Sequence, residues 1–282
     1  MSAPQLPFVQ LELAGTVGLD EGRYLARDPE RVLVVRVAGA PQPPRRLLRK
    51  PRPKDVAPAS EPPTVPITTI TVIRADPLGD RDAAERWLDA LRRDENALEA
   101  ELADGLRTAN LALHAQRIAS LDPFLADIAA EHALAVRIGF GEGEALADGQ
   151  WTEAVELPKG VRRRRLETLA PQEKIASVLG RREDPDAATG ALLRARADVD
   201  AERYRDAALQ VRVGVEAMLA DKAFTANAKQ ADDIAALTER RQGLGECANA
   251  ALQGELSEER RQELLETLKL AERVLRRRRA YG

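Results

Sequence analysis

Two histidines and one cysteine have the most versatile side-chain chemistry in this chain. Leu111 stands three residues before His114 and Ala129 three before His132, so the sequence has no Glu-x-x-His pair and no two histidines at i, i+4. A serine triad would need a Gly-x-Ser-x-Gly turn, which is also missing. Cys247 is alone, which excludes an intramolecular disulfide and is typical of a small buried hydrophobic residue. We therefore expect no metal site, no cofactor and no serine triad.

A glycine-rich stretch after a predicted strand has the spacing of a phosphate-binding loop. Gly139, Gly141 and Gly143 lie there, but Glu144 occupies the position where a dinucleotide fingerprint needs its third glycine. The Gly-Lys-Ser/Thr of a Walker A loop, which binds nucleoside triphosphates, is absent, and Glu142 would repel a phosphate. We interpret the stretch as a flexible hairpin loop.

Three arginine-rich segments could bind the phosphate backbone of a nucleic acid by releasing counterions. The candidate contacts are Arg45, Arg46, Arg49, Lys50, Arg162, Arg163, Arg276, Arg277 and Arg278. The formal net charge is −3, so any basic partner surface is local. The alternative is that residues 276–279 offset the negative end of a helix dipole, and that residues 162–165 pair with Glu167 and Glu173 on their own helix.

Arg107 and His114 are seven positions, or two helical turns, apart and therefore share a face of a predicted helix. The pair resembles the Arg-x(4–6)-His pair of HEPN ribonucleases, which implies contact with a scissile phosphate. Thr108 departs from the polar amide or acid that follows the arginine in that family. The alternative interpretation is a surface arginine and a partly buried histidine.

Leu192–Ala220 resembles the helical hairpins of HEPN domains and of tetratricopeptide repeats. The matching residues are Ala195, Asp198, Tyr204, Ala207, Ala208, Val211, Val215 and Leu219. The resemblance implies two packed helices. Glu202 stands where a glycine would normally make the turn, so one continuous helix is the alternative.

Residues 41–66 separate a β-patterned start from a mostly helical remainder. They contain nine of the seventeen prolines, and residues 41–54 carry six basic residues and no acidic one. Proline lacks a backbone donor and favours an extended chain, so this segment is predicted to be a linker or insertion.

The sequence predicts an α+β fold with a small antiparallel sheet and a long helix in residues 1–158, and an all-helical bundle in residues 161–282. Predicted strands cover 8–13, 24–27, 31–37, 67–74, 134–140 and 151–157, the first three forming a meander and the last two extending its sheet. Predicted helices cover 80–121, with a bend at Gly105, and 122–132. We expect 31–37 to pair with 67–74, because neither part holds enough strands alone.

The last predicted helix is Ser257–Arg279, with Ser257 as its N-cap. Its apolar stripe consists of Leu264, Leu265, Leu268, Ala271 and Leu275, and we expect it to pack on Val211, Val215 and Leu219.

The function favoured by the sequence is a non-enzymatic protein-interaction or scaffold protein that self-associates through helices 83–118 or 257–276. The first alternative is a nucleic-acid-associated protein that uses the arginine clusters, and the second is a HEPN-like ribonuclease. Neither a signal peptide nor a transmembrane helix is expected, so we predict a cytoplasmic location without membrane contact. Abundant arginine and alanine indicate a bacterial host with a high-GC genome.

Overall fold

The computed structural model describes residues 3–27, 29–39, 65–157, 175, 178–180, 186–225 and 230–281. The chain divides into two compact units, Met1–Thr168 and Leu169–Gly282. The first is a six-stranded antiparallel sheet with helices and the second is helical, which confirms the predicted α+β fold. The predicted boundary at 158–161 and the linker at 41–66 fall largely outside the described residues, so the predicted domain limits stay a prediction.

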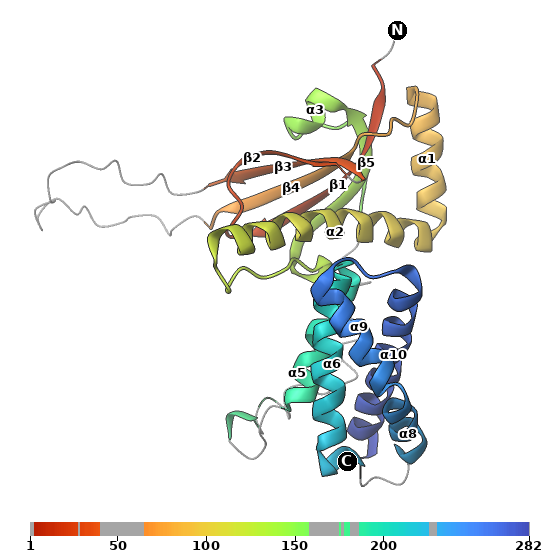
Figure 1. Ribbon diagram of the computed structural model, residues 1–282. Helices are drawn as coiled ribbons and strands as arrows, with labels where there is room; N and C mark the ends of the chain where they lie inside the picture. Colours follow the sequence, from red (N-terminus) through yellow and green to blue (C-terminus); the bar gives the residue numbers. More distant parts are fainter. Residues whose placement is uncertain are drawn as a thin grey trace, which may run out of the picture. The chain divides into compact units, whose positions relative to one another are not determined.

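The sheet of the first unit has the strand order β2-β3-β4-β1-β5-β6 (Figure 1). Its strands are β1 (Gln5–Ala14), β2 (Gly22–Arg27), β3 (Glu30–Ala38), β4 (Ile67–Arg74), β5 (Ala133–Glu142) and β6 (Glu153–Glu156). The prediction that 31–37 pairs with 67–74 is confirmed, because β3 runs antiparallel to β4 from Arg31↔Arg74 to Ala38↔Ile67. β5 and β6 extend the same sheet, also as predicted.

The predicted meander of the first three strands is wrong, because β1 lies in the centre of the sheet between β4 and β5. The reason is burial on both faces of β1: the consecutive side chains Phe8 and Val9 are 1% and 5% exposed, and Leu11 is fully buried. Consecutive apolar side chains point to opposite faces of a sheet, so they are all buried only in a strand that is covered on both faces. β2 and β3 form the one hairpin of the predicted meander.

Two helices on one face of the sheet replace the single long helix predicted for 80–121. α1 (Arg81–Arg93) and α2 (Glu95–Ser120) meet at Asp94 (Figure 1). The Asp94 carboxylate accepts hydrogen bonds from the Asn96 and Ala97 amides at 3.0 and 3.2 Å, so it caps the start of α2. The chain therefore turns at a capping residue, and α1 and α2 both pack on the sheet.

Gly105 does not bend α2, which is continuous through this position. A Cβ atom at residue 105 would lie 2.7 Å from the Cβ atom of Val9. Glycine therefore lets the backbone of α2 approach the central strand β1. The predicted bend is wrong, because the glycine is needed for the close approach of α2 to the sheet and does not interrupt the helix.

The segments on either side of β5 also differ from prediction. Residues 122–132 do not form a helix; they run as an irregular segment that ends in the 3-10 turn Ala130–His132. The predicted flexible loop after β5 contains α3 (Gly143–Ala147), which covers the other face of the sheet (Figure 1). Leu146 of α3 is 1% exposed and packs in the cluster that contains Phe8 and Val34, so the loop is anchored by apolar burial.

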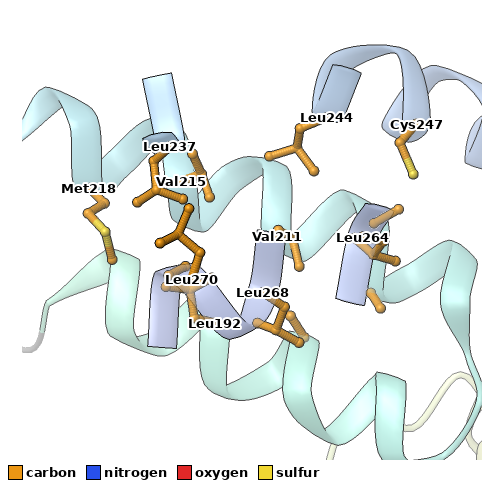
Figure 2. Close-up of a cluster of buried hydrophobic side chains, with 14 of the residues drawn as sticks. Leu192, Val211, Val215, Met218, Leu237, Leu244, Cys247, Leu264, Leu268 and Leu270 are labelled. Atoms are coloured by element: carbon orange, nitrogen blue, oxygen red, sulfur yellow. The ribbon is translucent and has the colours of Figure 1, made fainter. Parts of the chain in front are cut away.

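The second unit is a bundle around one apolar core (Figure 2). Its helices are α5 (Ala187–Asp200), α6 (Tyr204–Ala220), α7 (Lys222–Thr225), α8 (Ala231–Glu239), α9 (Arg241–Gln253) and α10 (Glu258–Tyr281). Leu268 of α10 is fully buried together with Val211 and Val215 of α6, which confirms the predicted packing of the last helix. Among the helices in the described parts of the chain, none is both long and apolar enough to cross a bilayer.

The hairpin that carried the family resemblance is formed by α5 and α6. Glu202 lies between them in the left-handed region, with φ of 58°, so the chain turns there and the continuous-helix alternative is wrong. Ala195 and Ala207 are fully buried in the core of the bundle. Small side chains thus let the two helices pack closely, while membership of the HEPN or tetratricopeptide families stays a prediction.

Candidate interaction surface

The predicted pair Arg107 and His114 lies on α2. The Arg107 guanidinium is 3.2 Å from Asp104, and the same carboxylate is 3.1 Å from the guanidinium of Arg31, a residue of β3 that is 8% exposed. Asp104 therefore holds α2 on the sheet, and Arg107 belongs to that ion-pair group. The contact between Arg107 and Asp104 lies within α2, and the ribonuclease hypothesis stays a prediction.

The arginines at the end of α10, which are also candidate nucleic-acid contacts, have intramolecular partners. Arg277 is 2.5 Å from Asp233 of α8, whose side chain is 9% exposed. Arg278 is 3.2 Å from Asp186, and its guanidinium carbon lies 4.1 Å from the ring centre of Phe224. Arg276 has a weaker contact, 3.9 Å from Glu272. The contacts of Arg277 and Arg278 fasten α10 to other parts of the bundle, whereas Glu272 lies on α10 itself.

The remaining nucleic-acid candidates, namely Arg45, Arg46, Arg49, Lys50, Arg162 and Arg163, lie outside the described residues. The lone cysteine has the predicted environment. Cys247 is 1% exposed in the core of the bundle, and burial raises the pKa of its thiol above the ordinary value. The thiol is therefore held in its neutral form, as in a small hydrophobic residue.

A surface that the sequence did not indicate forms where α2 ends. Leu121 terminates the helix in the left-handed conformation, with φ of 54° and ψ of 32°, and the chain then returns along α2. Two side chains of α2 hold the returning segment: Asn110 exchanges two hydrogen bonds with the backbone of Ile128, at 2.9 and 2.7 Å, and Arg117 donates to the Leu125 carbonyl oxygen at 2.7 Å. Residues 121–129 are thus fixed by polar side chains of α2 without being helical.

The β1–β2 loop packs against this segment at Gly18. Its φ of 84° favours glycine, and a Cβ atom at this position would lie 2.2 Å from the Leu125 side chain. Residues 13–18 and 124–132 together line an open hollow of about 430 Å³, whose apolar side chains include Val17, Leu125 and Ile128. This volume falls in the range of about 300–1,000 Å³ that is usual for binding pockets.

Large apolar side chains are exposed at the end of α2 and in the segment that follows it. Ile118, Leu121 and Phe124 are 61%, 87% and 90% exposed, and Phe124 also lines the hollow. We call these three residues the apolar ridge. Clustered exposed apolar residues commonly mark a surface that binds another molecule. A bulky residue in the left-handed conformation, as at Leu121, is itself rare and often occurs at functional sites.

The polar side chains that line the hollow are those of Thr16, Asp127 and His132. Asp127 lines it, but its carboxylate is 2.7 Å from the guanidinium of Arg117 and is thereby engaged. His132 lines the hollow as an exposed residue at the end of the 3-10 turn. The described residues contain no group of three or more His, Cys, Asp or Glu that could hold a metal ion.

Comparison with protein-family models, with curated proteins and with solved structures found no match. The function is therefore argued from the surface itself.

Proposed function

We propose that this chain is a non-enzymatic protein-interaction protein that contacts other protein chains through the apolar ridge and the hollow beside it. The observation that carries the proposal is the exposure of Ile118, Leu121 and Phe124 within seven consecutive residues, at 61%, 87% and 90%. Covering three such side chains removes apolar area from water at about 25 cal/mol per Å². Residues of this kind, next to a hollow, supply the apolar centre that a protein interface needs.

Self-association is the form of interaction that the sequence favoured. The fold leaves different surfaces available for it than the two predicted helix stripes. The apolar stripes of 83–118 and 257–276 face the cores of their own units: Leu88, Leu113 and Leu268, for example, are fully buried. A second chain must therefore use the remaining exposed faces. Leu111 and Ile118, which are 51% and 61% exposed, lie seven residues apart on the same face of α2. Ile118 is also the first residue of the ridge.

Sedimentation velocity at increasing protein concentration tests the proposal with a Leu121→Ser, Phe124→Ser double variant. We expect the unchanged chain to self-associate and the double variant to remain monomeric at the same concentrations. The matched control is Leu193→Ser on α5, which replaces a side chain that is 65% exposed in the other unit and is expected to leave association unchanged. A chain that stays monomeric throughout and to which no protein binds through the ridge would contradict the proposal.

Arg277 and Arg278 are bound to carboxylates within the bundle, so contact with a nucleic acid would compete with these ion pairs, and the nucleic-acid hypothesis stays a prediction. No observation on the described residues favours it over the ridge. The cytoplasmic location stays a prediction.

A further inference from the structure

The strand β2 (Gly22–Arg27) is at an edge of the six-stranded sheet, since β3 lies on one side of it and no strand of the described residues lies on the other. Five of its six residues are exposed, and the side chains of Tyr24 and Leu25 are 37% and 59% exposed. An exposed edge leaves backbone hydrogen-bonding groups open to another strand. β2 is therefore a candidate for strand pairing with a second chain.

The backbone hydrogen bonds of β3 show which residues of β2 face outward. The Glu30 carbonyl oxygen accepts a hydrogen bond from the Ala75 amide, at 3.3 Å, on the side of β4. The Val37 amide donates to the Glu21 carboxylate, at 2.7 Å, on the opposite side of β3. Backbone groups of a strand alternate between its two sides, so residues 31, 33 and 35 bond to their register partners 26, 24 and 22. The amide and carbonyl groups of residues 23, 25 and 27 then point away from the sheet.

These outward groups allow a second copy of β2 to pair antiparallel in a few registers, and the charges favour one of them. The register centred on Tyr24 uses the whole strand; it places Arg23 opposite Leu25, and Glu21 opposite Arg27, of the second copy. A shift by two residues in one direction sets Arg23 opposite its own copy, and a shift in the other direction sets it opposite Arg27. Like charges directly opposite each other destabilise a strand pair and opposite charges stabilise it, so the register centred on Tyr24 is selected.

We propose that two copies of this chain pair through their β2 strands, antiparallel about a twofold axis at Tyr24, and that their two sheets thereby join into one. The two Tyr24 side chains meet at a pair without hydrogen bonds, where side chains on neighbouring strands come closest. Glu21 keeps one oxygen on the Val37 amide, and the other oxygen meets Arg27 of the second copy. This pairing rests on the proposed function, self-association, and gives it a geometry.

The other edge of the sheet does not offer the same match. β6 (Glu153–Glu156) has four residues, and both of its glutamates are paired within the chain, Glu153 with Arg92 at 2.6 Å and Glu156 with Arg137 at 3.1 Å. A second copy of β6 would bring further carboxylates and no positive charge. Self-pairing is therefore assigned to β2.

The apolar ridge is close enough to β2 to belong to the same interface. Gly18 adjoins the Leu125 side chain at the hollow and lies four residues before Gly22, so the Cα atoms of the two glycines are at most about 14 Å apart. An interface of standard size covers about 800 Å² on each partner, which spans this distance. Two short strands alone pair weakly in water, so we expect association to need both the ridge and the β2 pairing.

Disulfide cross-linking of the full chain tests the register. Each variant is made in a Cys247→Ala background, so that the introduced thiol is the only one. Tyr24→Cys places the two thiols at the twofold axis, within the Cα separation that a disulfide needs. Arg27→Cys is the matched control on the same strand, because its two copies would be about 20 Å apart. In a glutathione redox buffer, we expect Tyr24→Cys to form a covalent dimer on a non-reducing gel about tenfold faster than Arg27→Cys, or more.

Proline at residue 25 tests the backbone pairing. Leu25→Pro removes an amide that points outward, so the fold of the single chain should be kept, whereas the strand pair loses a donor and meets the proline ring. Leu25→Thr is the control, because it keeps the amide and suits a strand. Sedimentation velocity should show dimerisation weakened about tenfold or more by proline and less than about threefold by threonine. Thermal melting checks that both variants keep the fold.

Equal rates of cross-linking for Tyr24→Cys and Arg27→Cys, or equal association of folded Leu25→Pro and Leu25→Thr chains, would overturn the pairing. If Leu25→Pro loses its fold, the cross-linking comparison decides alone. If association depends on Leu121 and Phe124 but not on the β2 variants, the proposed function stands and only the strand pairing is wrong. If the β2 variants act as expected but the Leu121→Ser, Phe124→Ser chain still dimerises, the pairing stands and the proposed role of the ridge falls. A chain that is monomeric and forms no Tyr24→Cys dimer overturns the pairing, whether or not another protein binds the ridge.

Discussion

Single residues in this chain often act as links between elements, and Arg277 is the best-defined example. Its guanidinium is 2.5 Å from Asp233, and Arg273 reaches the other oxygen of the same carboxylate at 3.0 Å. The Asp233 side chain is only 9% exposed, so it needs these cations. From sequence alone the arginines at the end of the last helix looked interchangeable, because nothing in the sequence places Asp233 beside them.

Arg277→Gln should therefore lower the free energy of unfolding by about 1 kcal/mol, since a mostly buried carboxylate loses one of two partners. Urea denaturation of the full chain measures the change. Arg276→Gln is the matched control: its guanidinium is 69% exposed and 3.9 Å from Glu272, so the midpoint should not move. Equal midpoints for the two variants would show that the Asp233 pair adds nothing to stability.

A second prediction for a single residue concerns Gly105. Gly105→Ala should destabilise the chain by about 1–3 kcal/mol, because the new methyl group would lie 2.7 Å from Val9 and overpack the contact between α2 and β1. Gly190→Ala on α5 is the control, since its Cβ would meet only the Arg194 side chain at 3.8 Å. There the better helix former should raise stability by up to about 1 kcal/mol. Thermal melts in which Gly105→Ala also gains stability would contradict the assigned contact.

At the scale of elements, local sequence predicted the type of structure better than its limits. β4 was predicted residue for residue as 67–74, because its run of β-branched residues is bounded by turn residues. The break at Asp94 was missed because the apolar spacing continues across it, and the cap acts through one carboxylate. Residues 122–132 were predicted as a helix because Asp122-Pro123 imitates a helix start, whereas Asn110 and Arg117 of α2 hold the segment in another conformation.

The last helix was predicted with nearly correct limits and correct packing, which allows a quantitative test. Leu268→Ala should lower the free energy of unfolding by about 2–5 kcal/mol, because this side chain is fully buried among Val211, Val215 and Leu264 (Figure 2). Leu252→Ala on α9 is the comparison, since its side chain is 66% exposed and should change stability by less than about 0.5 kcal/mol. A silent Leu268→Ala in chemical denaturation would show that α10 is not part of the core.

At the scale of the whole molecule, the candidate surface could not be predicted from the sequence. Leu121 and Phe124 look like the apolar positions of a helix, and only the turn at Leu121 and the return of the chain along α2 leave them exposed. The hollow combines residues 13–18 with residues 124–132, which are more than a hundred positions apart. Such a contact depends on the central place of β1 in the sheet, and the predicted meander placed β1 elsewhere.

That central place of β1 also predicts how the molecule responds to a cut in residues 41–66. β1 and β3 come from the part before the cut, and β4 and β5 from the part after it, yet β1 pairs with both β4 and β5 and β3 pairs with β4. Separating the two pieces would break three strand pairings and expose buried side chains such as Phe8, Leu11 and Val35. We therefore expect a chain cleaved at a protease site engineered into this segment to give two bands on a denaturing gel and one peak, at the elution volume of the intact chain, on gel filtration. Mild denaturant should then release both pieces together with the loss of the sheet. Pieces that separate without denaturant would show that the strands before residue 41 form a unit of their own and that the six-stranded sheet is not the folding unit.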